Sequence, residues 1–277
     1  MTIDAILSLP RRRRIGVAGL VMIALMVAIA ALAPFGLASP LEQDLENRFI
    51  NASFDHPFGT DQFGRDQLSR VVHASRQSLI VASLVALISG LGGGVLGIVS
   101  GYAGGRFDLL VQRAVDAVFA LPLVVLALVA VTTYPNSRLA IVIVLSIGFA
   151  PIIVRVTRAS VLSVRTAPFV EASQAMGAGG LQIIVRHIVP NVIGPWLIVA
   201  GTQVGVSILA ESSLSFLGFG APIADPSLGS LLGGEAQTFL HRAPWLIIWP
   251  GLAITLLVLS INLLFEGFAT GARAERR

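Results

Sequence analysis

The residues of this chain that could do chemistry are few, and their types argue against catalysis. All 19 basic residues are arginine, because lysine does not occur. A P-loop nucleotide site uses a lysine to reach the β- and γ-phosphates, so an ordinary Walker A site is excluded. Cysteine is also absent, which excludes disulfides, thiol catalysis and cysteine-ligated zinc. The four histidines are scattered and no nucleophile–base pair stands out, so we expect no catalytic residue, bound cofactor or metal.

Four charged residues are candidates for contacts at an outer loop or gate. Asp61, Arg65 and Asp66 form a polar cluster. These residues either make the turns of the loop or contact a binding protein or the outer gate, and the sequence favours neither role. Glu211 lies at the outer end of an apolar run. An ionisable residue inside a membrane is a functional candidate by default, but near a helix end it can reach water or a neighbouring helix. Both a structural role and a role in a transport pathway therefore stay open for Glu211.

The composition identifies the surroundings of these residues as a lipid bilayer. Only 12% of the residues are charged and 55% are hydrophobic, with a mean hydropathy of +0.84. An average soluble domain is about 25% charged, so a water-soluble protein with these proportions could not cover its surface. Apolar runs long enough, or nearly so, to cross a bilayer occur at 15–33, 79–99, 114–133, 139–154, 192–210 and 245–264. We predict an all-α integral membrane protein with about six transmembrane helices.

The arginines predict the orientation and the divisions of the chain. They are more frequent in the set of loops that shares a side with the four arginines at 11–14, so the positive-inside rule puts both termini in the cytoplasm. The run at 15–33 is longer than the roughly 7–15 residues of a signal-peptide core, which favours an uncleaved first helix. The predicted divisions are an N-terminal segment with the first helix (1–36), an extracytoplasmic loop (37–76), a five-helix core (77–268) and a cytoplasmic tail (269–277).

The longest cytoplasmic loop, about 158–190, predicts two short helices. Pro168 suits a first helical turn, Glu171 lies near the positive helix end, and Gly177 can end the helix in a left-handed conformation. We therefore expect one helix from about Pro168 to Met176 and a second over about 181–189. Before this loop, arginines 155 and 158 lie one turn apart and either pair with Asp116 or anchor the span at the membrane surface.

The predicted hairpin exposes apolar Phe169, Val170 and Met176 where water should surround it. A short amphipathic helix of this kind is typical of segments that dock in a groove on a partner. The alternative is a helix that lies on the lipid surface.

Three stretches resemble a known family. Glu171-Ala172-Ser173, followed by Gly177 and Pro190, resembles the "EAA" loop of bacterial ABC importer permeases. The stretch at 56–66 (HPFGTDQFGRD) and the stretch at 214–220 (LSFLGFG), with Pro-Trp at 244–245 and Trp-Pro-Gly at 249–251, resemble signatures of the dipeptide/oligopeptide/nickel branch. The resemblance covers nearly all of residues 10–270.

The resemblance implies a type I importer permease of the bacterial inner membrane, with a coupling helix that docks on an ATPase. The coupling residues carried over are Phe169, Val170, Glu171, Ala172, Ser173, Met176 and Gly177. Implied partners are a homologous second permease, two ATPase subunits or domains that hold ATP and Mg, and an extracytoplasmic binding protein, but no nucleic acid. The implied substrates are di- and oligopeptides, with nickel or another small solute as the alternative.

Two other classes of function stay open at the level of the residues. An ion-coupled secondary transporter would need acidic or histidine relays near mid-span and inverted repeats, and neither is clear in the sequence. A membrane scaffold would leave the hairpin around Glu171 unexplained. Residues that bind the solute cannot be named from the sequence.

Overall fold

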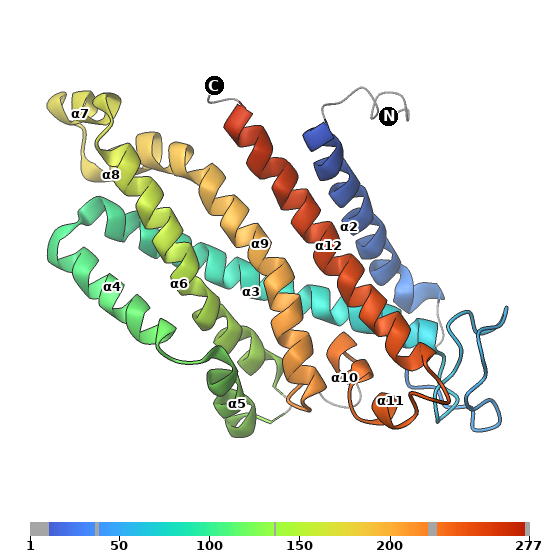
Figure 1. Cartoon of the computed structure of the whole chain (residues 1–277). Helices are drawn as coiled ribbons and strands as arrows, with labels where there is room; N and C mark the ends of the chain where they lie inside the picture. Colours follow the sequence, from blue (N-terminus) through green and yellow to red (C-terminus); the bar gives the residue numbers. More distant parts are fainter. Residues whose placement is uncertain (1–10, 37–38, 136, 221–225, 275–277) are drawn as a thin grey trace.

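The computed structural model describes residues 11–36, 39–135, 137–220 and 226–274, and these ranges are almost entirely helical (Figure 1). The helices are α2 (Arg11–Gly36), α3 (Gln67–Ala103), α4 (Gly105–Phe119), α5 (Leu123–Thr133), α6 (Arg138–Arg165), α7 (Pro168–Ala175), α8 (Gly180–Ile183), the π-helix η1 (Ile184–Ile188), α9 (Val189–Phe216), α10 (Leu228–Leu232), α11 (Glu235–Thr238) and α12 (Trp245–Ala274). Five of the six predicted apolar runs each lie within one helix, and the run at 114–133 is shared between α4 and α5. This confirms the all-α membrane class.

Four helical segments are long and apolar enough to cross a membrane: Gln67–Ala103, Arg138–Arg165, Gly180–Phe216 and Trp245–Ala269. The pair α4 and α5 makes a fifth if it counts as one bent span, and α2 has a shorter apolar stretch at Gly16–Ala31.

The predicted apolar run at 114–133 does not form one straight helix, because the chain bends by 78° between α4 and α5. Pro122 stands at the N-cap of α5. Proline lacks an N–H group and disfavours helical backbone at the residue before it, so the hydrophobic run is divided at this point.

Glycines allow α3 to pack closely against α6. Gly93, Gly97 and Gly101 lie four residues apart and therefore share one face of α3. A Cβ atom at Gly97 would lie only 2.7 Å from the carbonyl oxygen of Val154 in α6. Close approach through small residues is a main source of helix association in membranes, so this face fixes the α3–α6 pair.

The neighbouring face of α3 receives the indole of Trp196 from α9. The indole N–H donates to the carbonyl oxygen of Gly90 at 2.8 Å. A Cβ atom at Gly94 would lie 2.4 Å from the same indole nitrogen, so the ring occupies the space that a side chain would need. The close packing of both α6 and α9 against α3 therefore requires glycines, which have no side chain, along α3.

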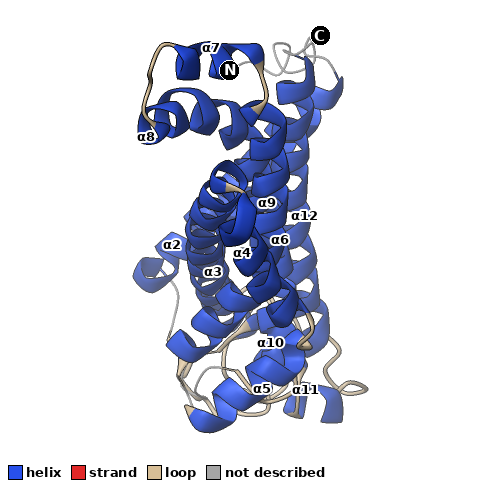
Figure 2. Ribbon diagram, turned by 90° about the vertical axis from the view of Figure 1, so that its left-hand side faces the viewer, coloured by secondary structure: helices blue, strands red, loops and turns tan. Residues whose placement is uncertain are grey.

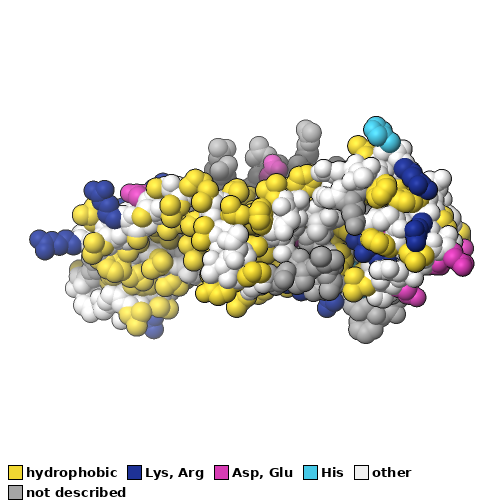
Figure 3. All heavy atoms as spheres, turned by 90° about the horizontal axis from the view of Figure 1, so that it is seen from below, with side chains coloured by type: hydrophobic (Ala, Val, Ile, Leu, Met, Phe, Trp, Pro, Cys, Tyr) yellow, Lys and Arg dark blue, Asp and Glu magenta, His cyan; other side chains and the backbone are white. Residues whose placement is uncertain are grey.

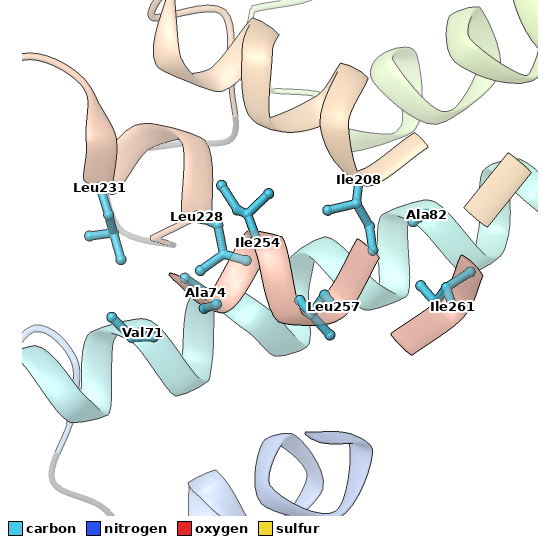
Figure 4. Close-up of a cluster of buried hydrophobic side chains, with 10 residues drawn as sticks. Val71, Ala74, Ala82, Ile208, Leu228, Leu231, Ile254, Leu257 and Ile261 are labelled. Carbon is cyan, nitrogen blue, oxygen red and sulfur yellow. The ribbon is translucent and has the colours of Figure 1, made fainter. Parts of the chain in front are cut away.

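A buried cluster joins α3, α9, α10 and α12 (Figure 4). Ile208 of α9 and Leu228 of α10 are completely buried, and Leu257 of α12 faces the same cluster. The labelled side chains of the four helices point toward one another in Figure 4. The short α10 is therefore packed into the bundle.

The two ends of the molecule differ. Helices α7 and α8 lie at one end, together with the beginning of α2 and the end of α12 (Figures 1 and 2). The loop at 39–66, α5, α10 and α11 lie at the other end, which we call the outer end because the sequence analysis predicts that it faces outward. Viewed from below, hydrophobic side chains cover much of the described surface, and charged ones lie mainly toward its left- and right-hand ends (Figure 3). Such extensive exposed hydrophobic surface is expected of a protein that contacts lipid.

Candidate functional sites

The predicted short helix in the long loop is present as α7 (Figure 2). Pro168 occupies its first turn, and Gly177 follows its end with φ +84°. The N–H of Gly177 donates to the carbonyl of Gln174 at 2.9 Å, and the N–H of Ala178 donates to that of Ser173 at 3.1 Å. This pair of bonds is a Schellman motif, in which a left-handed glycine ends the helix. The expected helix and its glycine stop are therefore confirmed.

One face of α7 is buried against the rest of the protein. Val170 is 0% exposed and Ser173 is 6% exposed. Val170 packs in a cluster that contains Ile98 of α3, Val161 of α6 and Ile183 of α8. The expectation that Val170 is exposed was wrong, because residues three apart on a helix share a face and this face is the one turned toward the bundle. Val170 and Ser173 therefore support the hairpin from beneath.

The opposite face of α7 is open. Phe169 is 45% exposed and Met176 is 82% exposed. Glu171, Ala172 and Gly177 are also exposed. An apolar tip with a carboxylate beside it lies at the surface of the molecule, on a base that packing holds in place.

Asp61 is the centre of a buried ion cluster at the outer end. Its side chain is 1% exposed. It accepts from the backbone N–H groups of Phe63 at 2.8 Å and Arg65 at 3.0 Å, and from Nε of Arg65 at 2.6 Å. Arg70 is a second ion-pair partner. The cluster thus makes the turn around Gly64, which has φ +70°.

Asp66 serves the start of α3. One of its carboxylate oxygens accepts from the backbone N–H of Ser69 at 2.8 Å, which is an N-cap bond. The other lies 3.1 Å from Nδ1 of His56. The side chains of Asp61 and Asp66 therefore have separate structural partners, although the two residues are near each other in the chain.

The three outer-end motifs of the sequence meet in space. Phe58 stacks on Trp249 of α12 with ring centres 3.9 Å apart. The indole N–H of Trp245 donates to the carbonyl of Thr60 at 3.1 Å. A cavity of about 510 Å³ lies beside them, lined by Asp61 and Arg65 from the loop and by residues of the 214–220 stretch, α10 and α12. The loop, the end of α9 and the start of α12 thus form one assembly.

Glu211 lies outside the lining of that cavity. It is 4% exposed and joins α9 to α3. Ser78 of α3 and Ser215 of α9 each donate a hydroxyl hydrogen bond to it at 2.8 Å. Of the four outer candidates, the cavity therefore brings together Asp61 and Arg65, whereas Asp66 and Glu211 stand apart.

Sequence reasoning missed the partner of Arg158. Its Nε donates to Asp108 of α4 at 2.6 Å, and Nη2 donates to the other carboxylate oxygen at 2.5 Å. The expected alternative of a pair between Arg155 and Asp116 is confirmed at 2.5 Å. The sequence offered a signal for Asp108, since it is an acid in the first turn of a helix that begins at the second of two adjacent glycines.

Comparison with known proteins identifies the family. The model for the "binding-protein-dependent transport system inner membrane component" matches residues 93–272, which is more than half of the chain and includes α7. The chain belongs to this family. This permease family also accounts for the helical architecture, and the predicted type I permease fold is confirmed.

Relatives extend the likeness beyond the matched segment. A Brucella suis protein whose name describes a peptide transport system permease is 36% identical over 92% of this chain and 86% of its own length. The dipeptide transport system permease protein DppC of Alkalihalophilus pseudofirmus is 34% identical over 93% of this chain and 84% of its own length. The glutathione transport system permease protein GsiD of Pectobacterium atrosepticum is 32% identical over 92% of this chain and 85% of its own length. The resemblance to the dipeptide and oligopeptide branch of permeases is thereby confirmed.

Proposed function

We propose that this chain is a permease subunit of an ATP-driven importer of di- and oligopeptides, and that it forms half of a translocation path beside a homologous second permease. Family membership supports the import role. The choice of peptides rests on relatives that are named for peptide and dipeptide transport. Glutathione, which another relative's name gives, is itself a tripeptide. Nickel or another small solute is the alternative.

The observation that carries the proposal is the exposed apolar tip of α7 on a buried base. Met176 and Phe169 expose hydrophobic surface, while Val170 beneath them is fully buried. A rigid helix with an exposed apolar face suits a groove on a protein partner. The partner is the ATPase, which supplies the ATP and Mg site that a chain without lysine lacks. ATP can shift this subunit between inward- and outward-facing states only through such a contact.

The hairpin end is the cytoplasmic end in this proposal. The four arginines at 11–14 begin α2 at the same end as α7 and the end of α12 (Figure 1), and arginine-rich loops favour the cytoplasm. Both termini are then cytoplasmic in the bacterial inner membrane. The predicted loop to residue 76 is shorter in the structure, because α3 already begins at Gln67. In this proposal the loop at 39–66 is extracytoplasmic, and a binding protein delivers the solute there.

Attachment of the ATPase tests the proposal. We would co-express the tagged chain with its neighbouring transport genes and quantify the ATPase subunits that co-purify. Met176→Glu puts a charge on the apolar tip and should weaken attachment by about 2 kcal/mol, roughly thirtyfold, which is the scale of an interface hot spot. Gly177→Pro should have a similar effect, because proline fixes φ near −65° and Gly177 has φ +84°.

The matched control is Phe54→Ala at the opposite end. Phe54 is 100% exposed, so the substitution also removes exposed apolar surface, and it should leave the ATPase attached. Equal recovery of ATPase with Met176→Glu and with Phe54→Ala, from complexes of normal size in detergent, would contradict the proposed role of α7.

A further inference from the structure

The corner between α3 and α4 is held by a network of charged and hydroxyl groups. The chain turns there through Gly104 and Gly105, which have φ +65° and +58°. Three residues later, Asp108 accepts both guanidinium bonds of Arg158 from α6. Ser100 in the last turn of α3 donates to the same carboxylate at 2.5 Å. One carboxylate therefore joins three helices at the corner.

A second arginine of α6 holds the other side of the corner. Nη1 of Arg165 donates to the carbonyl oxygens of Gly101 and Tyr102, at 3.1 and 3.2 Å. A cation is stabilised at the C-terminal end of a helix, where carbonyl groups have no partner within the helix. Arg165 is also the last residue of α6, just before α7 begins, so the clamp lies directly beside the hairpin.

The same corner packs against the hairpin. Ile98 of α3 shares a buried cluster with Val170 of α7 and Ile183 of α8. A Cβ atom at Gly180 would lie 3.4 Å from the ring of Tyr102. The hairpin, the end of α3 and the inner end of α6 are thus in continuous contact.

Helix α4 has little else to fix it. In α4, all of which lies in the described part of the chain, Val115 is the only buried residue. Leu109 and Leu110 are 58% and 69% exposed. The side chains of Asp108 and Arg158 are instead 14% and 30% exposed, and a bidentate pair of this kind is both directional and strong.

We infer that Asp108 and Arg158 are positioning residues that join the α3–α4 corner to the coupling hairpin as one rigid unit. A displacement of α7 is then carried along α4 to the bend at Pro122 and to α5 near the outer end. This inference rests on the proposed function, since it needs a partner that moves α7. It goes further in naming the path by which that movement reaches the broken span.

The structure offers a matched control between the same two helices. Arg155 pairs with Asp116 at 2.5 Å, but these side chains are 50% and 54% exposed. Exposed ion pairs contribute little, about 0–1 kcal/mol. Asp116→Asn should therefore leave the linkage between α4 and α6 intact, whereas Asp108→Asn should weaken it.

The test compares peptide uptake per ATP hydrolysed by the whole complex in proteoliposomes. Asp108→Asn should lower this ratio about fivefold or more, which is the lower end of usual coupling between sites. The amount of co-purified ATPase should stay unchanged, and Asp108→Glu should restore part of the ratio because it keeps the carboxylate. Asp116→Asn should leave the ratio within about twofold. An equal effect of Asp108→Asn and Asp116→Asn would overturn the inference.

A second measurement does not depend on the folding of a variant at position 108. The chain has no cysteine, so introduced cysteines are the only thiols of this chain that can take spin labels, and the complex with the unsubstituted chain gives the background from the partner subunits. In the complex with intact Asp108, the distance between labels at Leu110 and Gln182 should stay constant when ATP is added, while the distance between Gln182 and Leu252 of α12 changes. A change in the first distance would overturn the inference. Loss of the ATPase from the unmodified complex would instead overturn the proposed function itself.

Discussion

At the scale of the residue, buried charge in this permease is paired with specific partners. Asp61 has two arginines and two backbone N–H groups, and Glu211 has two serine hydroxyls. Burying a polar or charged group is costly unless hydrogen bonds or opposite charges satisfy it. Asp61 therefore stabilises the turn of the outer loop, and Glu211 joins α9 to α3.

The first prediction at this scale concerns Asp61. Asp61→Asn removes the charge that faces Arg65 and Arg70 in a buried site, and breaking a buried ion pair typically costs about 3–5 kcal/mol. The thermal unfolding midpoint of the purified protein in detergent should fall, and the loop at 39–66 should become sensitive to protease. Asp55→Asn is the control, since Asp55 is an exposed acid of the same loop and its loss should change neither property. Equal behaviour of the two variants would contradict the structural role given to Asp61.

The sequence predicts some residue roles better than others. Pro168, Glu171 and Gly177 were readable because helix ends require particular residue types. The burial of Val170 was not readable, because which face of a short helix turns inward depends on Ile98 and Val161, which lie far away in the chain. The partner of Arg158 was missed for the same reason, since fifty residues separate it from Asp108.

At the scale of the element, α3 is the helix on which the others are arranged. Its glycines meet α6 on one face and Trp196 of α9 on another. Hydropathy predicted the positions of the spans, because length and apolar composition are local properties of the sequence. It did not predict the break in the third run, where Pro122 divides α4 from α5. Membrane helices tolerate proline at many positions, and Pro151 lies within α6 without ending it.

A glycine substitution tests the packing of α3. Gly97→Ala should destabilise the protein by about 1–3 kcal/mol, because a Cβ atom there meets the backbone of α6 and overpacking has costs of this size. Gly92→Ala on the same helix is the control, since no atom lies within 4 Å of its Cβ position. Alanine there should be neutral or slightly stabilising, because it favours helix more than glycine does. Unfolding of both variants in a denaturing detergent would measure the difference, and equal stability would contradict the α3–α6 contact.

At the scale of the whole molecule, the two ends have different surface features. One end presents the exposed tip of α7 on a buried base, and the other presents the assembly of the loop, α10 and the start of α12 around a cavity. Composition predicted the membrane, and the motifs predicted the family, which the match over residues 93–272 confirms. The meeting of the three outer motifs was not predictable, because it depends on contacts between segments separated by more than a hundred residues, as between Thr60 and Trp245.

The central claim is that solute moves through this chain only when ATP is hydrolysed by partner subunits. The most direct measurement is uptake of a labelled dipeptide into proteoliposomes that contain the reassembled complex and its binding protein, with the chain alone as the comparison. We expect uptake by the complex to require ATP on the side of the ATPase, and we expect none by the chain alone under an ion gradient. Accumulation of dipeptide by the chain alone, driven by the ion gradient without ATP, would contradict the account and favour a secondary transporter.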